Sequence, residues 1–254
     1  MTIDETLAQI QRDIQQMAKA GERIVQDINR AFKLTKEKPQ MSVKLIAYTQ
    51  PTDASISMAE FIAYCARVSN PANQSNTLTA PKLLKYLAKH KHWSPFEMAN
   101  LVIEIETTRD IARQILRHRS FSFQEFSQRY AEVESAPMYR EARLQDKANR
   151  QSSIEVDDTS LQMEWSEHQR VIYDEAWEAY QWALRQGIAK EVARAVLPEG
   201  LTMSRMYVNG TVRSWIHYCS VRMDASTQKE HREIAEACWA IVVDAVPALG
   251  EIEL

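Results

Sequence analysis

The sequence predicts an α+β fold, in which many helices accompany a modest central sheet of mixed or antiparallel strands. Two short segments alternate apolar and polar residues, as half-buried strands do. Longer segments repeat their apolar residues at intervals of three and four, which is typical of amphipathic helices. The 254 residues suit one large domain or two small ones.

The first part of the main domain contains two expected strands and three expected helices. Residues 42–49, SVKLIAYT, are β-branched and alternating, which predicts a strand. Residues 56–69 and 80–90 have the spacing of helices. After a proline turn, residues 101–106, LVIEIE, alternate again and predict a second strand. Residues 110–117 return to helical spacing.

The second part of the main domain is expected to be helical. Residues 157–187 predict one long helix that ends at Gly187, since glycine is common just beyond a helix C-terminus. A shorter helix is expected over residues 190–196, KEVARAV. Two more are expected over residues 211–222 and 226–245.

The N-terminal region differs from the rest of the chain. Residues 1–35 place apolar residues at alternating intervals of three and four, which predicts an amphipathic helix with a heptad seam. This helix could lie on its own domain or form a coiled coil with another copy. Residues 36–40, KEKPQ, resemble a linker. We therefore divide the chain into an N-terminal extension, 1–40, and a main domain, 41–254.

Composition excludes several classes of protein. The net charge of −3 argues against a dedicated nucleic-acid binder, and no apolar run is long enough to span a membrane. The N-terminus lacks the pattern of a secretion signal. Three widely spaced cysteines favour neither a zinc site nor a disulfide framework, so we expect no metal and a cytoplasmic location, or the host cytoplasm for a viral protein.

Glycine is scarce, and this limits how the chain could bind a nucleotide. The five glycines cannot form a P-loop or a dinucleotide-binding GxGxxG motif. Any phosphate would have to be held by side chains, for which the planar guanidinium of arginine is best suited.

One segment, residues 117–130, concentrates such chemistry in the sequence RHRSFSFQEFSQRY. The first cations could simply complement the negative end of the preceding helix. The later polar residues need another explanation. Ser122 lies two residues before Gln124, and Ser127 lies two before Arg129. Residues two apart share a face in an extended chain, and such a face suits a phosphate or a planar heterocycle.

This segment resembles the signature of flavin-dependent thymidylate synthases, RHRxxSxNxxSxRY. The matching residues are Arg117, His118, Arg119, Ser122, Ser127, Arg129 and Tyr130. Further similar segments are RVS ending at Ser69, HWSPFEM from His92, ARAVLP with Arg194, TVRSWIHY with Arg213, and SVRMDASTQKEHREI with Arg222. The resemblance spans about residues 42–245, so the N-terminal helix is an addition to the family pattern.

The resemblance implies an α+β homotetramer with active sites at subunit junctions. It implies that dUMP is converted to dTMP, with 5,10-methylenetetrahydrofolate as carbon donor and NADPH-reduced FAD as hydride source. The implied FAD contacts are Ser69, His92, Ser94, Glu97, Arg117, His118, Arg119, Gln124, Glu125, Arg213 and His217. The implied dUMP contacts are Gln114, Arg117, Glu125, Ser127, Gln128, Arg129, Arg194 and Arg222. Arg222 is the implied catalytic residue, because a guanidinium beside the uracil would stabilise negative charge on the ring.

Three residues depart from the family pattern. Gln124 replaces an asparagine, Met98 follows P-F-E where many members have histidine, and Ser226 stands at a position that is often histidine. These changes leave room for a related flavin-dependent enzyme that modifies C5 of another pyrimidine nucleotide. Two further alternatives are a non-catalytic nucleotide-binding protein and a nucleic-acid module that stacks bases on the phenylalanines of the signature.

Overall fold

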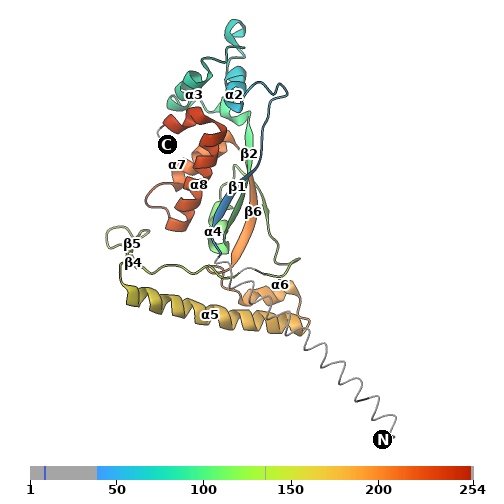
Figure 1. Cartoon of the computed structure of the whole chain (residues 1–254), viewed down its shortest axis with the longest axis vertical. Coiled ribbons are helices and arrows are strands. Elements are labelled where there is room, and N and C mark those ends of the chain that lie inside the picture. The colour runs from blue at the N-terminus through green and yellow to red at the C-terminus, as the bar shows by residue number, and fades with distance from the viewer. Residues whose placement is uncertain (1–8, 10–38, 135, 253–254) are drawn as a thin grey trace. The chain divides into compact units, whose positions relative to one another are not determined.

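A four-stranded antiparallel sheet lies at the centre of the fold (Figure 1). The computed structural model describes residue 9, residues 39–134 and residues 136–252. The helix predicted over residues 1–35 therefore lies almost wholly outside the described residues. The sheet and its helices belong to one compact unit formed by Gln40–Val133 and Pro137–Leu254.

The order of the strands in the sheet is β1-β2-β6-β3, and each neighbouring pair is antiparallel. The strands are β1 (Ser42–Tyr48), β2 (Asn100–Thr108), β6 (Met203–Thr211) and β3 (Ser122–Glu125). The two strands predicted from alternation, β1 and β2, are confirmed. The central strand β6 has no counterpart among the predicted elements, and neither does the small hairpin of β4 (Arg143–Gln145) and β5 (Ser153–Glu155).

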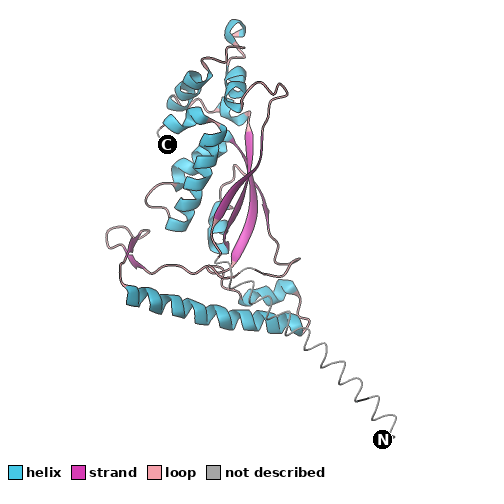
Figure 2. Cartoon of the chain, in the orientation of Figure 1, coloured by secondary structure: helices cyan, strands magenta, loops and turns pink. Residues whose placement is uncertain are grey.

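Three helices cover one face of the sheet (Figure 2). They are α4 (Arg109–Ile115), α7 (Val212–Arg222) and α8 (Lys229–Ala245). Between them and the sheet lies the main core, to which β2 contributes Leu101, Ile103 and Ile105 as fully buried side chains. Each such side chain contributes roughly 1.5–3 kcal/mol when it is removed from water. This core fixes α4 and α7 relative to each other, and both carry predicted site residues.

The helices α2 (Met58–Ala66) and α3 (Ala80–Lys89) pack together beyond the end of this layer, where they also contact the 3₁₀ turns η2 (Ser94–Glu97) and η4 (Pro247–Glu251). The start of α2 is fixed by a capping box, in which Ser57 Oγ accepts from the Glu60 amide and the Glu60 carboxylate accepts from the Ser57 amide. The helices predicted over 56–69 and 80–90 are thus confirmed.

The long helix α5 (Thr159–Arg185) begins at Asp158, whose carboxylate accepts a hydrogen bond from the Leu161 amide at 3.0 Å. At its other end Gly187 adopts a φ of 77°, and its amide bonds back to the Leu184 carbonyl. The Ile188 amide bonds to the Ala183 carbonyl, which completes a Schellman motif. The predicted glycine cap is confirmed, and the chain turns from it into α6 (Lys190–Ala193).

Gly210 on β6 allows a close approach that anchors the signature segment. A Cβ atom at this position would overlap the ring of Phe121, which lies across the strand. That ring is buried and packs on Trp215 with ring centroids 4.5 Å apart. The bend between α4 and β3 is therefore held against α7 by an aromatic contact that only glycine permits.

We expect Gly210→Ala to lower the free energy of unfolding by about 1–3 kcal/mol, because the added methyl group overpacks the Phe121 contact. Urea denaturation followed by circular dichroism measures this change. Gly200→Ala is the matched control, since its Cβ would meet no atom within 4 Å. Equal stabilities of the two variants would contradict the proposed role of Gly210.

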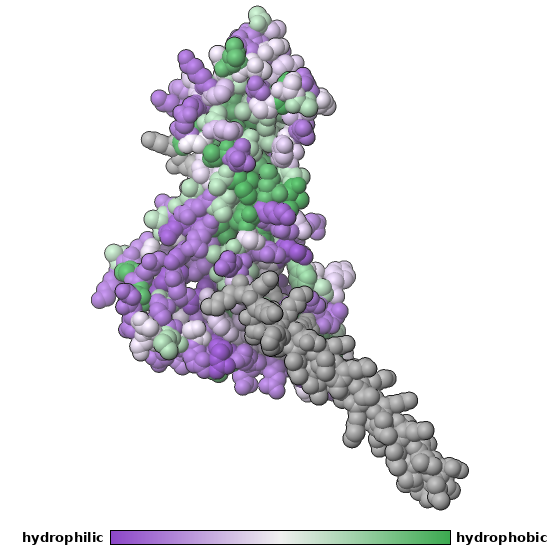
Figure 3. Space-filling view, viewed as in Figure 1, coloured by the Kyte–Doolittle hydropathy of each residue, from purple (hydrophilic) through white to green (hydrophobic). Residues whose placement is uncertain are grey.

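The opposite face of the sheet carries a row of paired polar side chains from all four strands. Lys44 lies opposite Glu104, which lies opposite Tyr207, which in turn lies opposite Gln124. Ile46 and Tyr48 on β1 are also exposed. Figure 3 shows an apolar patch near the middle of the visible surface, with hydrophilic residues around it. None of the described helices is both long enough and apolar enough to cross a membrane.

Candidate active site

The signature segment begins where α4 ends and runs into β3. Arg117 and Arg119 follow the helix, and both side chains are exposed. Among the described residues neither guanidinium makes a hydrogen bond or an ion pair, whereas most other arginines of the described regions do. Two uncommitted cations two residues apart in the chain are suited to an anionic ligand such as a phosphate.

His118, between these arginines, contacts the end of α7. Arg222 Nε donates a hydrogen bond to His118 Nε2 over 2.9 Å, so the imidazole accepts at this atom and is neutral. Burial, together with the nearby charges of Arg222 and His217, lowers the pKa of His118 to about 4. Neither terminal nitrogen of Arg222 makes a contact of this kind among the described residues. The fork of Arg222 therefore stays available for a ligand while its Nε is held in place.

Gln114, on the last turn of α4, is held from the start of α8. Its Nε2 donates to Gln228 Oε1 over 2.9 Å, and its Oε1 lies 3.2 Å from His231 Nδ1. His231 is fully buried, and burial is the main reason why its pKa is lowered to about 3. Ring contacts with Tyr218 join His231 and His118 into one cluster. Gln114, His118 and Arg222 thus form the first group of site residues.

The first group predicts a dependence of stability on pH. In the unfolded chain a histidine binds its proton at about pH 6.5, whereas in the folded chain His118 and His231 stay neutral to about pH 4 and 3. Between these values the unfolded state binds more protons, so the stabilisation is complete above about pH 6.5 and is lost as the pH falls. Each histidine makes the free energy of unfolding fall by up to ~1.4 kcal/mol for each unit by which the pH is lowered in this range.

Urea denaturation at several values between pH 7 and pH 5 measures this slope. His118→Gln is expected to reduce it, and His168→Gln on the exposed side of α5 is the control that leaves it unchanged. Identical slopes for the wild type and His118→Gln would contradict this assignment.

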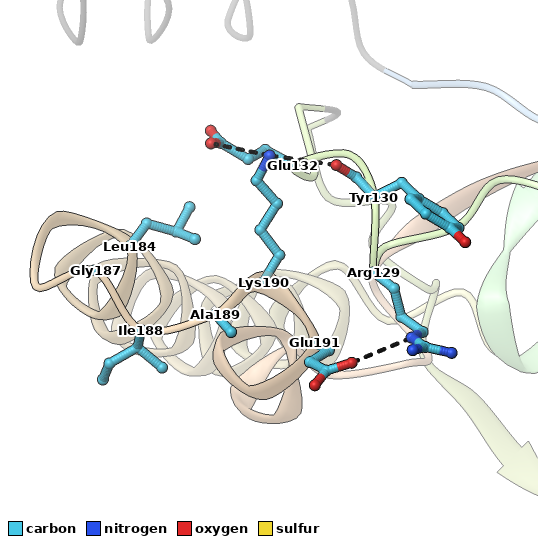
Figure 4. Close-up of a pocket in the computed structure, with 9 residues that line it drawn as sticks. All are labelled: Arg129, Tyr130, Glu132, Leu184, Gly187, Ile188, Ala189, Lys190 and Glu191. Atoms are coloured by element: carbon cyan, nitrogen blue, oxygen red, sulfur yellow. Dashed lines mark hydrogen bonds and ion pairs between the residues drawn. The ribbon is translucent and has the colours of Figure 1, made fainter.

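Arg129 and Arg194 form a second group, at the end of α5. Arg129 Nε donates to Glu191 Oε2 over 3.2 Å, and Arg194 Nε donates to the Glu191 carbonyl over 3.4 Å. Figure 4 shows Arg129 and Glu191 beside a cavity of about 520 Å³. Lys190, on the same cavity, donates to the Tyr130 carbonyl over 3.3 Å. Because Arg129 and Glu191 are both exposed, their ion pair is weak enough for a phosphate to displace.

Glu97 and Arg213 form the third group, through an ion pair between η2 and the first turn of α7. Arg213 and Arg222 lie at opposite ends of α7, nine residues apart, and face different partners. Four other predicted flavin contacts, Ser69, His92, Ser94 and His217, are exposed.

The remaining residues of the signature lie on β3 and the turn after it. Glu125 accepts from Ser204 Oγ over 2.8 Å and lies 3.7 Å from Arg109 Nη1. Gln128 is buried. The extended chain expected through Arg129 is wrong beyond Glu125, because the Tyr130 amide bonds back to the Ser127 carbonyl and closes a turn. Ser127 and Arg129 therefore do not share a strand face.

The chain is similar to several known proteins. The family model described as thymidylate synthase complementing protein matches residues 44–248. A probable flavin-dependent thymidylate synthase of Paramecium bursaria Chlorella virus 1 is 48% identical over 212 residues, which cover 83% of this chain and 98% of the relative. The flavin-dependent thymidylate synthase of Synechocystis is 47% identical over 214 residues, with the same two coverages.

The chain belongs to the flavin-dependent thymidylate synthase family. The resemblance found in the sequence is thereby confirmed. Among solved structures, the UMP/dUMP methylase PolB from Streptomyces cacaoi, bound with 5-Br dUMP, is similar with a TM-score of 0.73 and 26% identity. The similarity covers 84% of this chain and 93% of PolB. It is consistent with the predicted α+β fold.

The three departures from the pattern of the flavin-dependent thymidylate synthase family lie at the surface. Gln124 is exposed on β3, opposite Tyr207, and Met98 is exposed after η2. Ser226 is used inside the loop between α7 and α8, where its amide and hydroxyl both donate to the Asp224 carboxylate. Its hydroxyl is therefore committed within the chain.

Sequence reasoning missed the residues that support the first group. Gln228, Glu230 and His231 lie in the quoted segment SVRMDASTQKEHREI, but no role was expected for them. Glu230 is almost fully buried and pairs with Arg140 at 3.0 Å and Arg143 at 2.7 Å. A glutamate in the first turn of a predicted helix normally signals only a favourable charge at its N-terminus, so the sequence offered no reason to single it out.

Proposed function

We propose that this chain is a flavin-dependent thymidylate synthase that converts dUMP to dTMP. FAD, reduced by NADPH, would supply the hydride, and 5,10-methylenetetrahydrofolate the carbon. The main support is the 47–48% identity to relatives of that name, which extends over 98% of their length. The site residues fit a flavin and a nucleotide because Arg117 and Arg119 present two exposed, uncommitted guanidinium groups for phosphates.

Arg222 would polarise the pyrimidine. With its Nε held by His118, its two terminal nitrogens can reach a uracil carbonyl and the neighbouring ring nitrogen. They would favour negative charge on that carbonyl and ring nitrogen, and the added electron density would make C5 a better nucleophile towards the one-carbon unit. The guanidinium stays protonated, so it acts by its charge and moves no proton.

The thiols give no support to the flavin-free route, which needs a cysteine nucleophile. Cys219 and Cys238 are fully buried, and burial raises the pKa of both far above the usual value. Burial also raises the pKa of Cys65. All three cysteines are free, which is compatible with the cytoplasmic location that we propose.

Complete active sites would form between subunits of a homotetramer. The cavity beside Arg129 is lined by neither Gln114 nor Arg222, and the contacts described above place Gln114 and Arg222 in the first group but Arg129 in the second. If all three hold one dUMP, a second chain has to bring Arg129 and Arg194 to the Arg222 of the first. Folate and NADPH would then bind at the same junction, over the flavin.

A product assay tests this function. Purified protein is expected to carry a yellow flavin that bleaches with NADPH, and to form dTMP from dUMP and methylenetetrahydrofolate, as detected by mass spectrometry. UMP is tested in parallel because PolB is a UMP/dUMP methylase. Methylation of UMP alone would favour the related C5-modifying enzyme, and flavin binding without any product would favour a non-catalytic protein.

The nucleic-acid alternative can be checked with the same preparation. The stacking hypothesis relied on the phenylalanines of the signature, yet Phe121 is buried against Gly210 and Trp215. Its ring is unavailable for base stacking. Retardation of oligonucleotides by a colourless protein would contradict our proposal.

A further inference from the structure

The amide of Gln114 lies within a directed chain of hydrogen bonds that starts at a buried carboxylate. Glu230 Oε2 accepts from Gln228 Nε2 over 3.0 Å, and Gln228 Oε1 accepts from Gln114 Nε2 over 2.9 Å. At the far end Gln114 Oε1 lies 3.2 Å from His231 Nδ1. Four side chains from α4, α8 and the residue before α8 are thus connected in one line.

The ionised carboxylate determines the direction of every bond in this line. Burial alone would raise the pKa of Glu230, but Arg140, backbone hydrogen bonds and Arg143 together lower it, so this carboxylate is ionised and can only accept. Gln228 must therefore turn its NH₂ group towards Glu230 and its oxygen towards Gln114.

The same reasoning continues to the histidine. Because Gln228 offers an oxygen, Gln114 must turn its NH₂ group towards Gln228 and its own oxygen towards His231. His231 must then carry its proton on Nδ1. Its Nε2 is left as a buried acceptor without a partner among the described residues, which suits a ring that stays neutral.

We propose that Glu230 and Gln228 are positioning residues for the substrate, because they fix the direction in which Gln114 presents its amide. This inference rests on the proposed function, in which Gln114 contacts dUMP. With one N–H used by Gln228 and the oxygen facing His231, Gln114 keeps one N–H to donate. It therefore offers a donor to the nucleotide, and a carbonyl oxygen is the group that it would recognise.

Gln228→Met tests this role without disturbing the ion pairs of Glu230 with Arg140 and Arg143. We expect the KM for dUMP to rise about tenfold, with kcat changed much less, because the Gln114 amide can then rotate. Gln169→Met is the matched control. Gln169 is another amide held by hydrogen bonds inside the fold, but it bonds to the backbone of Arg140 and not to Gln114, so its loss should leave the KM unchanged.

A double-mutant cycle separates positioning from general packing. If Gln228 acts only through Gln114, then Gln228→Met has no further effect on the KM for dUMP in a Gln114→Met background. Effects that add would show a merely structural role and overturn the proposal.

The protonated nitrogen of His231 provides a readout that does not need activity. Nitrogen NMR of the flavin-bound wild type at pH 7 is expected to show the His231 proton on Nδ1. In Gln228→Met the proton should lose this preference for Nδ1. A wild-type proton on Nε2 would overturn the chain of hydrogen bonds even if dTMP is formed. Conversely, a wild type with the proton on Nδ1 but without dTMP formation would retain the chain of hydrogen bonds and refute the proposed function.

His231 itself offers a conservative substitution. His231→Asn keeps a donor close to the position of Nδ1 and is expected to retain a KM near that of the wild type. His231→Leu removes the donor and should raise the KM as Gln228→Met does. Equal KM values for these two variants would contradict the part assigned to His231.

Discussion

Arg222→Ala is expected to reduce turnover of dUMP at least about 100-fold while the protein keeps its flavin. The variant loses the guanidinium fork, and His118, the partner of Arg222 among the described residues, is neutral and supplies no positive charge in its place. Flavin content is read from the visible spectrum and turnover from dTMP formation. Arg222→Lys should recover only part of the activity, because lysine keeps the charge but lacks the planar fork.

The same variant should change His118. Arg222 is one of the causes of its low pKa, so the pKa of His118 is expected to rise towards the ordinary value in Arg222→Ala. Proton NMR titration of this histidine measures the change. Loss of flavin with normal turnover after reconstitution would contradict the role given to Arg222.

Arg140→Ala is expected to lower the free energy of unfolding by about 3 kcal/mol. Arg140 is nearly buried and joins two elements, since its guanidinium lies 3.0 Å from both Asp110 on α4 and Glu230 on α8. It also donates to Thr108 Oγ1 over 2.6 Å. Without Arg140, two partly or fully buried carboxylates lose a partner, and the penalty of their desolvation is no longer offset.

Urea denaturation of the flavin-bound enzyme measures this loss. Arg170→Ala is the control, because Arg170 also pairs with two carboxylates, Glu167 and Asp174, but does so on the exposed side of α5. Exposed pairs contribute little, so this variant should lie within about 1 kcal/mol of the wild type. Equal losses in both variants would show that burial of the Arg140 cluster is not the deciding factor.

Local patterns in the sequence predicted those parts of the fold whose residues alternate or repeat clearly. The strand β2 places Leu101, Ile103 and Ile105 on one face, and α5 ends at the expected glycine. The strand β6 was missed because two of its inward positions, Ser204 and Gly210, are not apolar and hide the alternation. The requirement for glycine at position 210 comes from the ring of Phe121, which is far away in the sequence. The residues next to position 210 therefore do not indicate it.

The site was predicted by resemblance more than by physical reasoning from the sequence. The signature placed His118 in the site, but its hydrogen bond to Arg222 joins residues 104 positions apart. The line from Gln114 to Glu230 depends in the same way on how α8 packs against α4. Spacing along one element says nothing about such contacts between elements. The assigned ligand roles themselves stay predictions until the assays above are made.

The separation of Arg129 from Arg222 has a genetic consequence. Arg129→Ala and Arg222→Ala would each inactivate every site of a pure assembly, yet they would damage different halves of a shared site. Co-expression of the two variants should therefore restore some turnover, because about a quarter of the junctions in randomly mixed assemblies would combine two intact halves. Such complementation between two inactive alleles would show that neighbouring chains build one centre together.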